Sequence, residues 1–502
     1  MKKRSPKVRE IPEKIIGRER EQELLNDLIR SKKSEFIAIY GRRRIGKTYL
    51  IKNFMSSVSG TFFHVTGIQK GTSKDQLEEF AKQIGKTFYN GPSIIPSKRW
   101  IDAFEKLTEA IDEMPKNKTI ILFFDELPWM ATPRSRLLTA LELYWNRYWV
   151  FDKRIKLIIC GSATSWIIEN IINNEGGLHN RVTRSIQLKP FSLNEAKKYL
   201  KEKKIHLNNC QILDLYMVLG GIPLYWSFVR KGLSSSQCID ELCFRDDGPL
   251  IKEFDRLFES LFEDPKPYVD LIRIIAKKRY GIGQNELIKV SKLPDGGNTV
   301  RRLMQLEEAG FIMGLVPYGH KDKGKYYVID DEYSLFYLSW IEPNIKTIYK
   351  KIQTAGYWKS QSKLSSWKSW SGYAFESVCY KHIDHIRKAF LIDPGATVGT
   401  WRYAPRVKEK SEGAQIDLLF DRLDGVITLC EIKSSDKLYA IDKLYAKSLL
   451  RKMDVFRKQT RTKKQLFFSM VTTHGLKPTI YSEELISVEA TLEDLFLDRN
   501  YV

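Results

Sequence analysis

Short apolar runs alternate with amphipathic stretches between residue 15 and about residue 190. Because helices cover both faces of a parallel sheet, uniformly apolar runs of this length predict buried parallel strands. The alternation therefore predicts a doubly wound α/β domain over residues 1–191. Its strand-like runs are EFIAIYG, GTFFHVTG, TIILFFDE, IKLIICGS and RSIQLKPF.

The pattern changes after this first domain. Residues 192–263 show helical periodicity that the sequence GGIP interrupts once, which predicts a helical lid. Residues 264–345 show an apolar helix, a helix-turn-helix pair and a hairpin, the order of elements in a winged helix. A Trp- and Lys-rich linker over residues 346–370 then precedes a last α/β domain over residues 371–502.

The longer helix of the predicted winged helix has one apolar face. Arg301, Arg302 and Gln305 are left on its outward side, where they suit phosphates and base edges. The hairpin tip YGHKDKGK is basic enough to contact a nucleic-acid backbone. A winged helix can also serve as a lid or docking module, so DNA contact is one of two interpretations. The predicted core stripe is Val300, Leu303, Met304, Leu306 and Ala309.

Charge favours a polyanionic partner. The 502 residues include 83 Lys and Arg against 61 Asp and Glu, a net charge of +22. Such an excess favours nucleic acid over membrane, because basic side chains release counterions from phosphates; a generally Lys-rich proteome is the alternative. The cysteines form no CxxC pair, and no apolar run is long enough for a membrane span. We therefore predict a cytoplasmic protein with reduced cysteines and no membrane association.

One motif predicts nucleotide binding. The sequence GRRRIGKT, from Gly41 to Thr48, lies between a strand and a helix, which is the context that a P-loop requires. Backbone N–H groups of this loop, which includes Arg44 and Gly46, would hold phosphates of ATP. Lys47 would reach the β- and γ-phosphates, and the Thr48 hydroxyl would bind Mg²⁺.

An acidic pair complements the loop. The apolar run IILFF ends in Asp125 and Glu126, which places both at the carboxyl end of a strand. Asp125 would hold Mg²⁺, and Glu126 would polarise the water that attacks ATP. A helix cap is the alternative role for such a pair. The combination with GRRRIGKT favours ATP binding and hydrolysis.

Two further polar positions follow along the chain. The next strand ends in small polar residues, and Ser162 or Thr164 could sense the γ-phosphate, although a simple capping role is an equal alternative. Arg181 precedes the final strand, where an arginine of a homo-oligomeric ring ATPase can act on the neighbouring subunit's nucleotide. A surface arginine without a role is the other interpretation.

The stretches IIGREREQELLNDL, GRRRIGKT, FFDELPWM, CGSATSW and GGIPLY resemble the archaeal-type ATPases of the STAND branch, relatives of AAA-type ATPases. The resemblance covers nearly the whole chain, because such proteins commonly continue into a winged helix and a restriction-endonuclease-like domain. It implies a P-loop NTPase sheet, Gly17 and Arg18 near the adenine, and GGIP at the lid. It does not define a substrate.

The last domain carries a second group of candidate site residues. Two apolar runs, AQIDLLF and VITLCEIK, bring Asp417, Glu431 and Lys433, and an earlier amphipathic helix brings Glu376. Helix acid, strand acid and then E-x-K resembles the PD-(D/E)xK nucleases, without the proline. The three carboxylates would supply oxygen ligands for Mg²⁺, and Lys433 would orient water or offset phosphate charge.

Strand geometry tests this second site. Glu431 and Lys433 share a face because side chains alternate with a period of two. A two-residue turn at Asp424 and Gly425 would direct Asp417 to the opposite face. A three-residue loop with Gly425 at positive φ would place Asp417 opposite Glu431, and we predict that loop.

The helix that follows adds basic residues, with Lys443, Lys447, Arg451 and Lys458 along one side.

The leading hypothesis is an ATP-dependent protein that acts on double-stranded DNA with Mg²⁺ in its last domain, in defence or in the maintenance of a mobile element. The alternative is a STAND-type signalling switch whose last domain binds a partner and cleaves nothing. A scaffold that binds ATP without turnover is disfavoured by Glu126.

Overall fold

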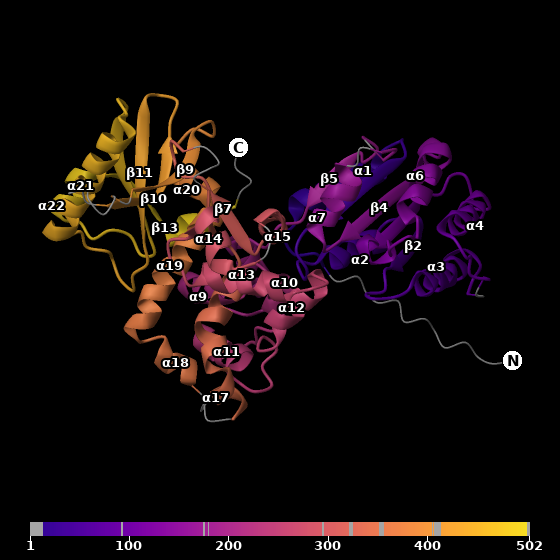
Figure 1. The fold of residues 1–502 in the computed structure, drawn as a ribbon, viewed down its shortest axis with the longest axis horizontal. Helices are drawn as coiled ribbons and strands as arrows, with labels where there is room; N and C mark the ends of the chain where they lie inside the picture. The colour runs from indigo at the N-terminus through magenta and orange to yellow at the C-terminus, as the bar shows by residue number, and fades with distance from the viewer. Residues whose placement is uncertain are drawn as a thin grey trace. The chain divides into compact units, whose positions relative to one another are not determined.

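The computed structural model describes residues 14–91, 94–173, 176–178, 180–293, 296–320, 325–350, 356–403, 405 and 413–498 (Figure 1). The chain divides into two compact units, residues 1–190 and residues 191–502. None of the described helices is both long and apolar enough to cross a membrane.

Unit 1 is built on a five-stranded parallel sheet in the order β2-β3-β4-β1-β5. Strands β3 and β4 are buried along their whole length, as their apolar sequences require. The predicted parallel sheet is therefore confirmed. Its strands are β1 (Glu35–Tyr40), β2 (Thr61–Thr66), β3 (Ile120–Asp125), β4 (Ile155–Gly161) and β5 (Arg184–Gln187).

Helices flank this sheet (Figure 1). An aromatic core that includes Phe63, Phe80, Phe104 and Phe124 joins β2 and β3 to the helices after β2. Strand β4 lies between β1 and β3, so the carboxyl ends of these three strands form one continuous edge. The helices are α1 (Glu19–Arg30), α2 (Lys47–Ser56), α3 (Ser73–Phe88), α4 (Trp100–Asp112), α5 (Leu127–Met130), α6 (Leu137–Arg147) and α7 (Thr164–Ile167).

Unit 2 begins with a group of helices. Gly220, in the GGIP sequence, has a φ of 58°, and a Cβ there would lie 2.7 Å from Glu332 Oε2. Only glycine combines this conformation with so close an approach. The helices are α8 (Leu193–Glu202), α9 (Asn209–Leu219), α10 (Pro223–Trp226), α11 (Ser235–Cys243) and α12 (Glu253–Leu261).

A small three-stranded antiparallel sheet follows, in the order β6-β8-β7. Leu303 and Leu306 of its long helix are buried as predicted, but Met304 is 53% exposed and Thr299 is buried instead. The core face is therefore rotated from the predicted stripe. Residues 321–324 of the predicted basic tip lie outside the described residues. The elements are α13 (Lys266–Ala276), β6 (Ile282–Gly283), α14 (Gln284–Ser291), α15 (Gly296–Glu308), β7 (Ile312–Leu315) and β8 (Tyr326–Ile329).

The described part of the Trp-rich segment is ordered. Trp358, Trp367 and Trp370 pack with Trp340 and Phe336 in one aromatic cluster. Helix α19 starts before residue 371, so the predicted boundary falls inside a helix. The helices are α16 (Glu332–Phe336), a π-helix (Tyr337–Ile341), α17 (Ile345–Tyr349), α18 (Tyr357–Gln361), α19 (Ser365–Lys381) and α20 (Ile383–Ala389).

The last sheet of unit 2 is mixed, in the order β13-β12-β11-β10-β9. Strands β9, β10 and β11 pair antiparallel, whereas β11, β12 and β13 pair parallel. Figure 1 shows α21 and α22 beside this sheet, and α19 and α21 contact its central strands. The elements are β9 (Thr397–Tyr403), β10 (Ala414–Asp421), β11 (Val426–Lys433), α21 (Lys443–Thr460), β12 (Gln465–Thr472), α22 (Ile480–Leu485), β13 (Ile486–Thr491) and α23 (Leu492–Leu495).

Candidate functional site

The loop between β1 and α2 has the backbone geometry of a phosphate cradle. Gly41 has a φ of 138°, and a Cβ there would lie 2.4 Å from the carbonyl oxygen of Leu188. Gly46, with a φ of 88°, leads into the first turn of α2. Lys47 is buried, and its Nζ donates to the carbonyl oxygens of Gly41 and Arg42 at 2.8 and 2.9 Å. The loop therefore wraps the ammonium that the sequence assigns to phosphate binding.

The predicted Mg²⁺ ligands of unit 1 lie side by side. Thr48 Oγ1 donates to Asp125 at 3.0 Å from each carboxylate oxygen. A hydroxyl and a carboxylate are hard oxygen donors, so this pair fits the cation that accompanies ATP. Thr48 belongs to the first turn of α2 and Asp125 ends β3, so the sheet edge brings them together.

His64 and Thr66, both from β2, complete the surroundings of Asp125. Thr66 stands beside Asp125 in the β2–β3 register, and His64 Nε2 lies 3.6 Å from Asp125 Oδ2. Burial raises the pKa of Asp125, but hydrogen bonds from His64 and Thr48 outweigh it and hold the pKa below its ordinary value. Neither residue is predicted from the sequence to belong to the site. Their position at the carboxyl end of the strand next to β3 was the available signal.

Glu126 is held by the end of β4. The backbone N–H and the hydroxyl of Ser162 both donate to Glu126 Oε2 at 2.9 Å. Glu126 itself has a φ of 50°, in the left-handed region. Ser162 was predicted to sense the γ-phosphate. In this structure it binds the carboxylate predicted to polarise water.

Of the other residues predicted to bind nucleotide, some lie at the phosphate loop and one does not. Arg18 is buried beside Gly17 and donates to the carbonyl oxygen of Ile45 at 3.4 Å, so the segment before α1 reaches the phosphate loop. Arg44 is in the loop with a φ of 72°. Arg181 is exposed, and within the described residues no hydrogen bond or ion pair links its side chain to the other nucleotide residues.

The β10–β11 hairpin confirms the predicted register. Leu418 stands opposite Cys430, and the N–H of Arg422 donates to the carbonyl oxygen of Val426 at 2.9 Å. The loop is therefore Leu423–Gly425, and Gly425 has a φ of 83°. Continuing this register places Asp417 opposite Glu431, and directly opposed residues share a face of the sheet.

Lys433 lies between these two carboxylates. Its Nζ is 3.4 Å from Glu431 Oε2 and 4.0 Å from Asp417 Oδ2. The N–H of Ile432 also donates to Asp417 Oδ2 at 3.1 Å. Burial lowers the pKa of Lys433, but the carboxylates of Glu431 and Asp417 raise it more, so this ammonium stays charged.

Glu376, from α19, joins the same electrostatic cluster. Burial and then the charge of Asp417 raise the pKa of Glu376 to about 8. Burial and then the charge of Glu431 raise the pKa of Asp417 to about 6. The four residues predicted from the two apolar runs and the helix are therefore brought within mutual electrostatic range. A crowded acid cluster of this kind favours binding of positive charge.

Lys452 of α21 already supplies positive charge. Its Nζ lies 2.6 and 2.7 Å from the two carboxylate oxygens of Glu431, and the Tyr445 hydroxyl donates to Oε2 at 3.2 Å. The basic residues predicted along this helix are others, and neither Tyr445 nor Lys452 is among them. Tyr445 and Lys452 are seven residues apart, which places them on one helix face beside the apolar stripe.

The donor chemistry of the cluster suits a divalent cation, but its arrangement is different from a cation cage. Among the described residues, no group of three or more His, Cys, Asp or Glu is placed to hold a metal ion. Both oxygens of Glu431 are already bound by Lys452. A cation bound by Glu376, Asp417 and Glu431 therefore requires Lys452 to leave Glu431.

Comparison with known proteins finds a family match in the first part of the chain. Residues 16–227 match the model of a family described as an ATPase domain predominantly from Archaea. This part of the chain is therefore similar to the archaeal ATPases that the sequence resembles. The match does not extend to the carboxylate cluster, whose nuclease-like role stays a prediction.

Individual relatives cover more of the chain. An uncharacterized protein of Methanocaldococcus jannaschii, MJECL04, is 27% identical over 379 residues, which are 74% of this chain and 78% of the relative. The Walker-type ATPase paby2304 of Pyrococcus abyssi is 18% identical, and the match covers 64% of this chain and 96% of that protein with a TM-score of 0.43. The ORC2 protein of Aeropyrum pernix, in ADPNP-ADP complexes, is 16% identical, and the match covers 69% of this chain and 98% of that protein with a TM-score of 0.42. At such TM-scores the two structures carry no conclusion about function.

Proposed function

We propose that the chain hydrolyses ATP and acts on DNA, and that the carboxylate–lysine cluster of unit 2 cleaves a phosphodiester backbone. One observation carries the second part. Asp417 and Glu431 stand opposite each other in the register of β10 and β11, and Lys433 Nζ lies within 4.0 Å of both. An ammonium between two acids, beside a third acid, is the side-chain set that phosphodiester hydrolysis uses.

In unit 1 each residue has a defined task. Lys47 would bind the β- and γ-phosphates, with the backbone of Gly41–Gly46 around them. Thr48 and Asp125 would hold Mg²⁺, which neutralises the charge that develops on the phosphates. Glu126 would turn from Ser162 to orient the attacking water. In a homo-oligomer, the exposed Arg181 would be available to the nucleotide of a neighbouring subunit.

In unit 2 the residues of the cluster would handle the charges and the proton of the proposed cleavage. Lys433 would offset the negative charge of the scissile phosphate. Glu376, whose pKa is raised to about 8, keeps its proton at neutral pH while no cation is bound, and it would release that proton when a cation binds beside it. A divalent cation would supply electrostatic stabilisation, with Glu376, Asp417 and Glu431 as the residues to hold it.

The ion pair between Lys452 and Glu431 favours a second candidate function. An ammonium bound at 2.6 Å to the central carboxylate can replace a cation permanently. The chain would then be a STAND-type ATPase switch, and the C-terminal sheet would bind a partner without cleaving it.

The two candidates separate in one experiment. Purified full-length protein is incubated with plasmid and linear DNA, with Mg²⁺ or Mn²⁺, and with or without ATP. The variants are Lys433→Ala, Lys47→Ala and, as a surface control, Lys447→Ala. Cleavage lost in Lys433→Ala and kept in the other two supports an autonomous nuclease. ATP turnover without cleavage under any condition supports the switch.

A further inference from the structure

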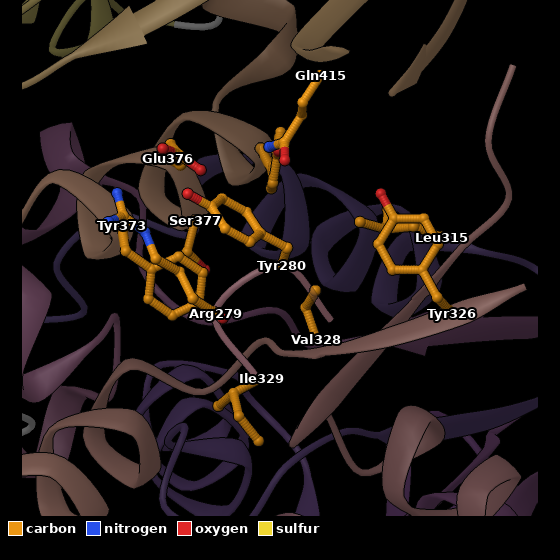
Figure 2. A pocket seen from close by; sticks show the side chains of 11 residues that line it. Arg279, Tyr280, Leu315, Tyr326, Val328, Ile329, Tyr373, Glu376, Ser377 and Gln415 are labelled. Atoms are coloured by element: carbon orange, nitrogen blue, oxygen red, sulfur yellow. The ribbon is translucent and has the colours of Figure 1, made fainter. Parts of the chain in front are cut away.

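A pocket of unit 2 borders the carboxylate cluster. Figure 2 shows its lining, which combines the turn after α13 and the β7–β8 hairpin with α19 and the start of β10. The space between these side chains, about 380 Å³, includes open solvent, so the pocket is a partly open depression of the surface and not an enclosed small-molecule cavity.

The pocket is connected to the cluster by two residues. Glu376 lines the pocket and belongs to the cluster. Gln415 also lines the pocket, and its Nε2 donates to Asp417 Oδ1 at 3.3 Å. A ligand in this pocket would therefore lie next to the groups that are proposed to act on a phosphodiester.

Two arginines meet at one ring on the rim of the pocket. The guanidinium carbon of Arg279 lies 5.5 Å from the ring centre of Tyr280, and that of Arg402 lies 5.6 Å from the same ring. Tyr280 is 48% exposed. In the part of the chain that the structure describes, no carboxylate oxygen lies within 4.0 Å of either guanidinium. The charge of Arg279 also acts on Glu376 across the pocket and lowers the pKa of that carboxyl. Two cations without an ion pair at one ring form a local site for an anion.

The backbone holds both arginines in place. Arg279 and Tyr280 are the central residues of a turn that the N–H of Gly281 closes on the carbonyl oxygen of Lys278 at 2.8 Å. Gly281 has a φ of 77°, and a Cβ there would lie 2.5 Å from the ring of Tyr326. Arg402 stands opposite Gln415 in the β9–β10 register. Neither arginine depends on a loose loop for its position.

The small sheet is also fastened to β9. The N–H of Tyr318 donates to the carbonyl oxygen of Thr400 at 2.8 Å, and the hydroxyls of Tyr326 and Thr400 are 2.7 Å apart. The pocket is therefore a built feature of unit 2. Its two walls come from residues 279–329 and residues 373–415, which are 44 positions apart at their nearest ends.

We propose that Arg279 and Arg402, held against Tyr280, form a phosphate subsite for a DNA strand whose neighbouring phosphate lies at the carboxylate cluster. This inference rests on the proposed function and deepens it. Guanidinium groups bind phosphate oxygens through planar pairs of N–H donors, which a lysine cannot reproduce. The small sheet would thus supply substrate contacts to the C-terminal site.

Binding without cleavage tests the subsite. Full-length protein is titrated into a fluorescently labelled duplex or the matching single strand, with EDTA present, and anisotropy gives Kd at several salt concentrations. The R279A/R402A variant should raise Kd by at least tenfold and reduce the slope of log Kd against log salt by about 0.9 for each lost duplex contact. Lys278→Ala is the control for loss of one nearby positive charge, since Lys278 precedes Arg279 and its ammonium lies 3.1 Å from Glu286.

Further variants sharpen the result. Arg279→Lys should restore less than half of the lost affinity, and Tyr280→Phe should bind like the wild type while Tyr280→Ala does not. Unchanged binding by R279A/R402A, or an equal loss in Lys278→Ala, overturns the subsite and leaves the proposed function standing. Weakened binding by a protein that never cleaves supports the subsite and overturns cleavage alone. Absence of DNA binding by the wild type overturns both.

Discussion

The two carboxylate sites, one in each unit, balance their charges in opposite ways. Asp125 is a buried acid, and burial raises its pKa, but hydrogen bonds from His64 and Thr48 lower it more. Asp417 and Glu376 are buried beside other acids, so their pKa values are raised to about 6 and about 8. The first site is organised around an ionised carboxylate. In the second site the carboxyl groups repel one another, and bound positive charge reduces that repulsion.

The largest expected effect separates the sites by activity. Glu126→Gln removes the carboxylate that would orient water, and we expect kcat for ATP hydrolysis to fall about 100- to 10,000-fold with nucleotide affinity retained. Glu376→Gln, the equivalent change in unit 2, should leave ATP turnover within about twofold. Steady-state phosphate release and nucleotide titration measure both. Equal losses in the two variants would contradict independent sites.

The next effect concerns the ion pair of Lys452. Lys452→Ala leaves the fully buried Glu431 with a weaker partner, and we expect the free energy of unfolding to fall by about 3 kcal/mol. Addition of Mg²⁺ or Mn²⁺ should raise the Tm of this variant more than that of the wild type, because the oxygens of Glu431 become available. Lys447→Ala, on the exposed side of α21, is the control. If Mg²⁺ and Mn²⁺ leave the Tm of every variant unchanged, the result favours the switch that does not cleave DNA.

A pH series tests the opposite signs of the two sites. The ordinary pKa of a glutamate is about 4.5 and that of Glu376 is about 8, so the folded chain binds more protons between these values and loses stability as pH rises. Glu376→Gln should therefore stabilise the chain at pH 8 by up to about 4 kcal/mol and change little below pH 4. Denaturant titrations across this range provide the measurement.

Asp125 should respond in the other direction. Its lowered pKa contributes stability that is present at neutral pH and is lost as the pH falls below the ordinary range of an aspartate. Asp125→Asn should destabilise the chain by about 1 kcal/mol at pH 7, and the difference from the wild type should shrink in acid. The same sign for Asp125→Asn and Glu376→Gln at neutral and higher pH would end the contrast between the sites.

The smallest effect concerns Ser162. Its hydroxyl holds Glu126, and loss of one hydrogen bond of about 1 kcal/mol should release the carboxylate and raise basal ATP turnover about threefold in Ser162→Ala. Ser162→Thr, which keeps a hydroxyl, is the conservative comparison. A tenfold fall in turnover would instead support the γ-phosphate role that the sequence predicts.

Much of both sites could be predicted from local sequence. The loop Gly41–Thr48 and the strand that ends at Asp125 follow from apolar runs and glycine spacing, which act over a few residues. The opposition of Asp417 and Glu431 followed from the period of two and the turn chemistry at Gly425. The buried face of a helix was harder to predict, because Met304 of the predicted apolar stripe is exposed and Thr299, outside that stripe, is buried.

The sequence by itself determined the parallel strands of unit 1, the phosphate loop and the register of the β10–β11 hairpin, since each depends on neighbours along the chain. Only the tertiary structure decided which groups balance the acids, His64 at Asp125 and Lys452 at Glu431, and which segment brings Arg402 to the ring of Tyr280. These contacts join distant segments. The pKa of each carboxyl depends on burial and neighbouring charge, which exist only after the segments pack.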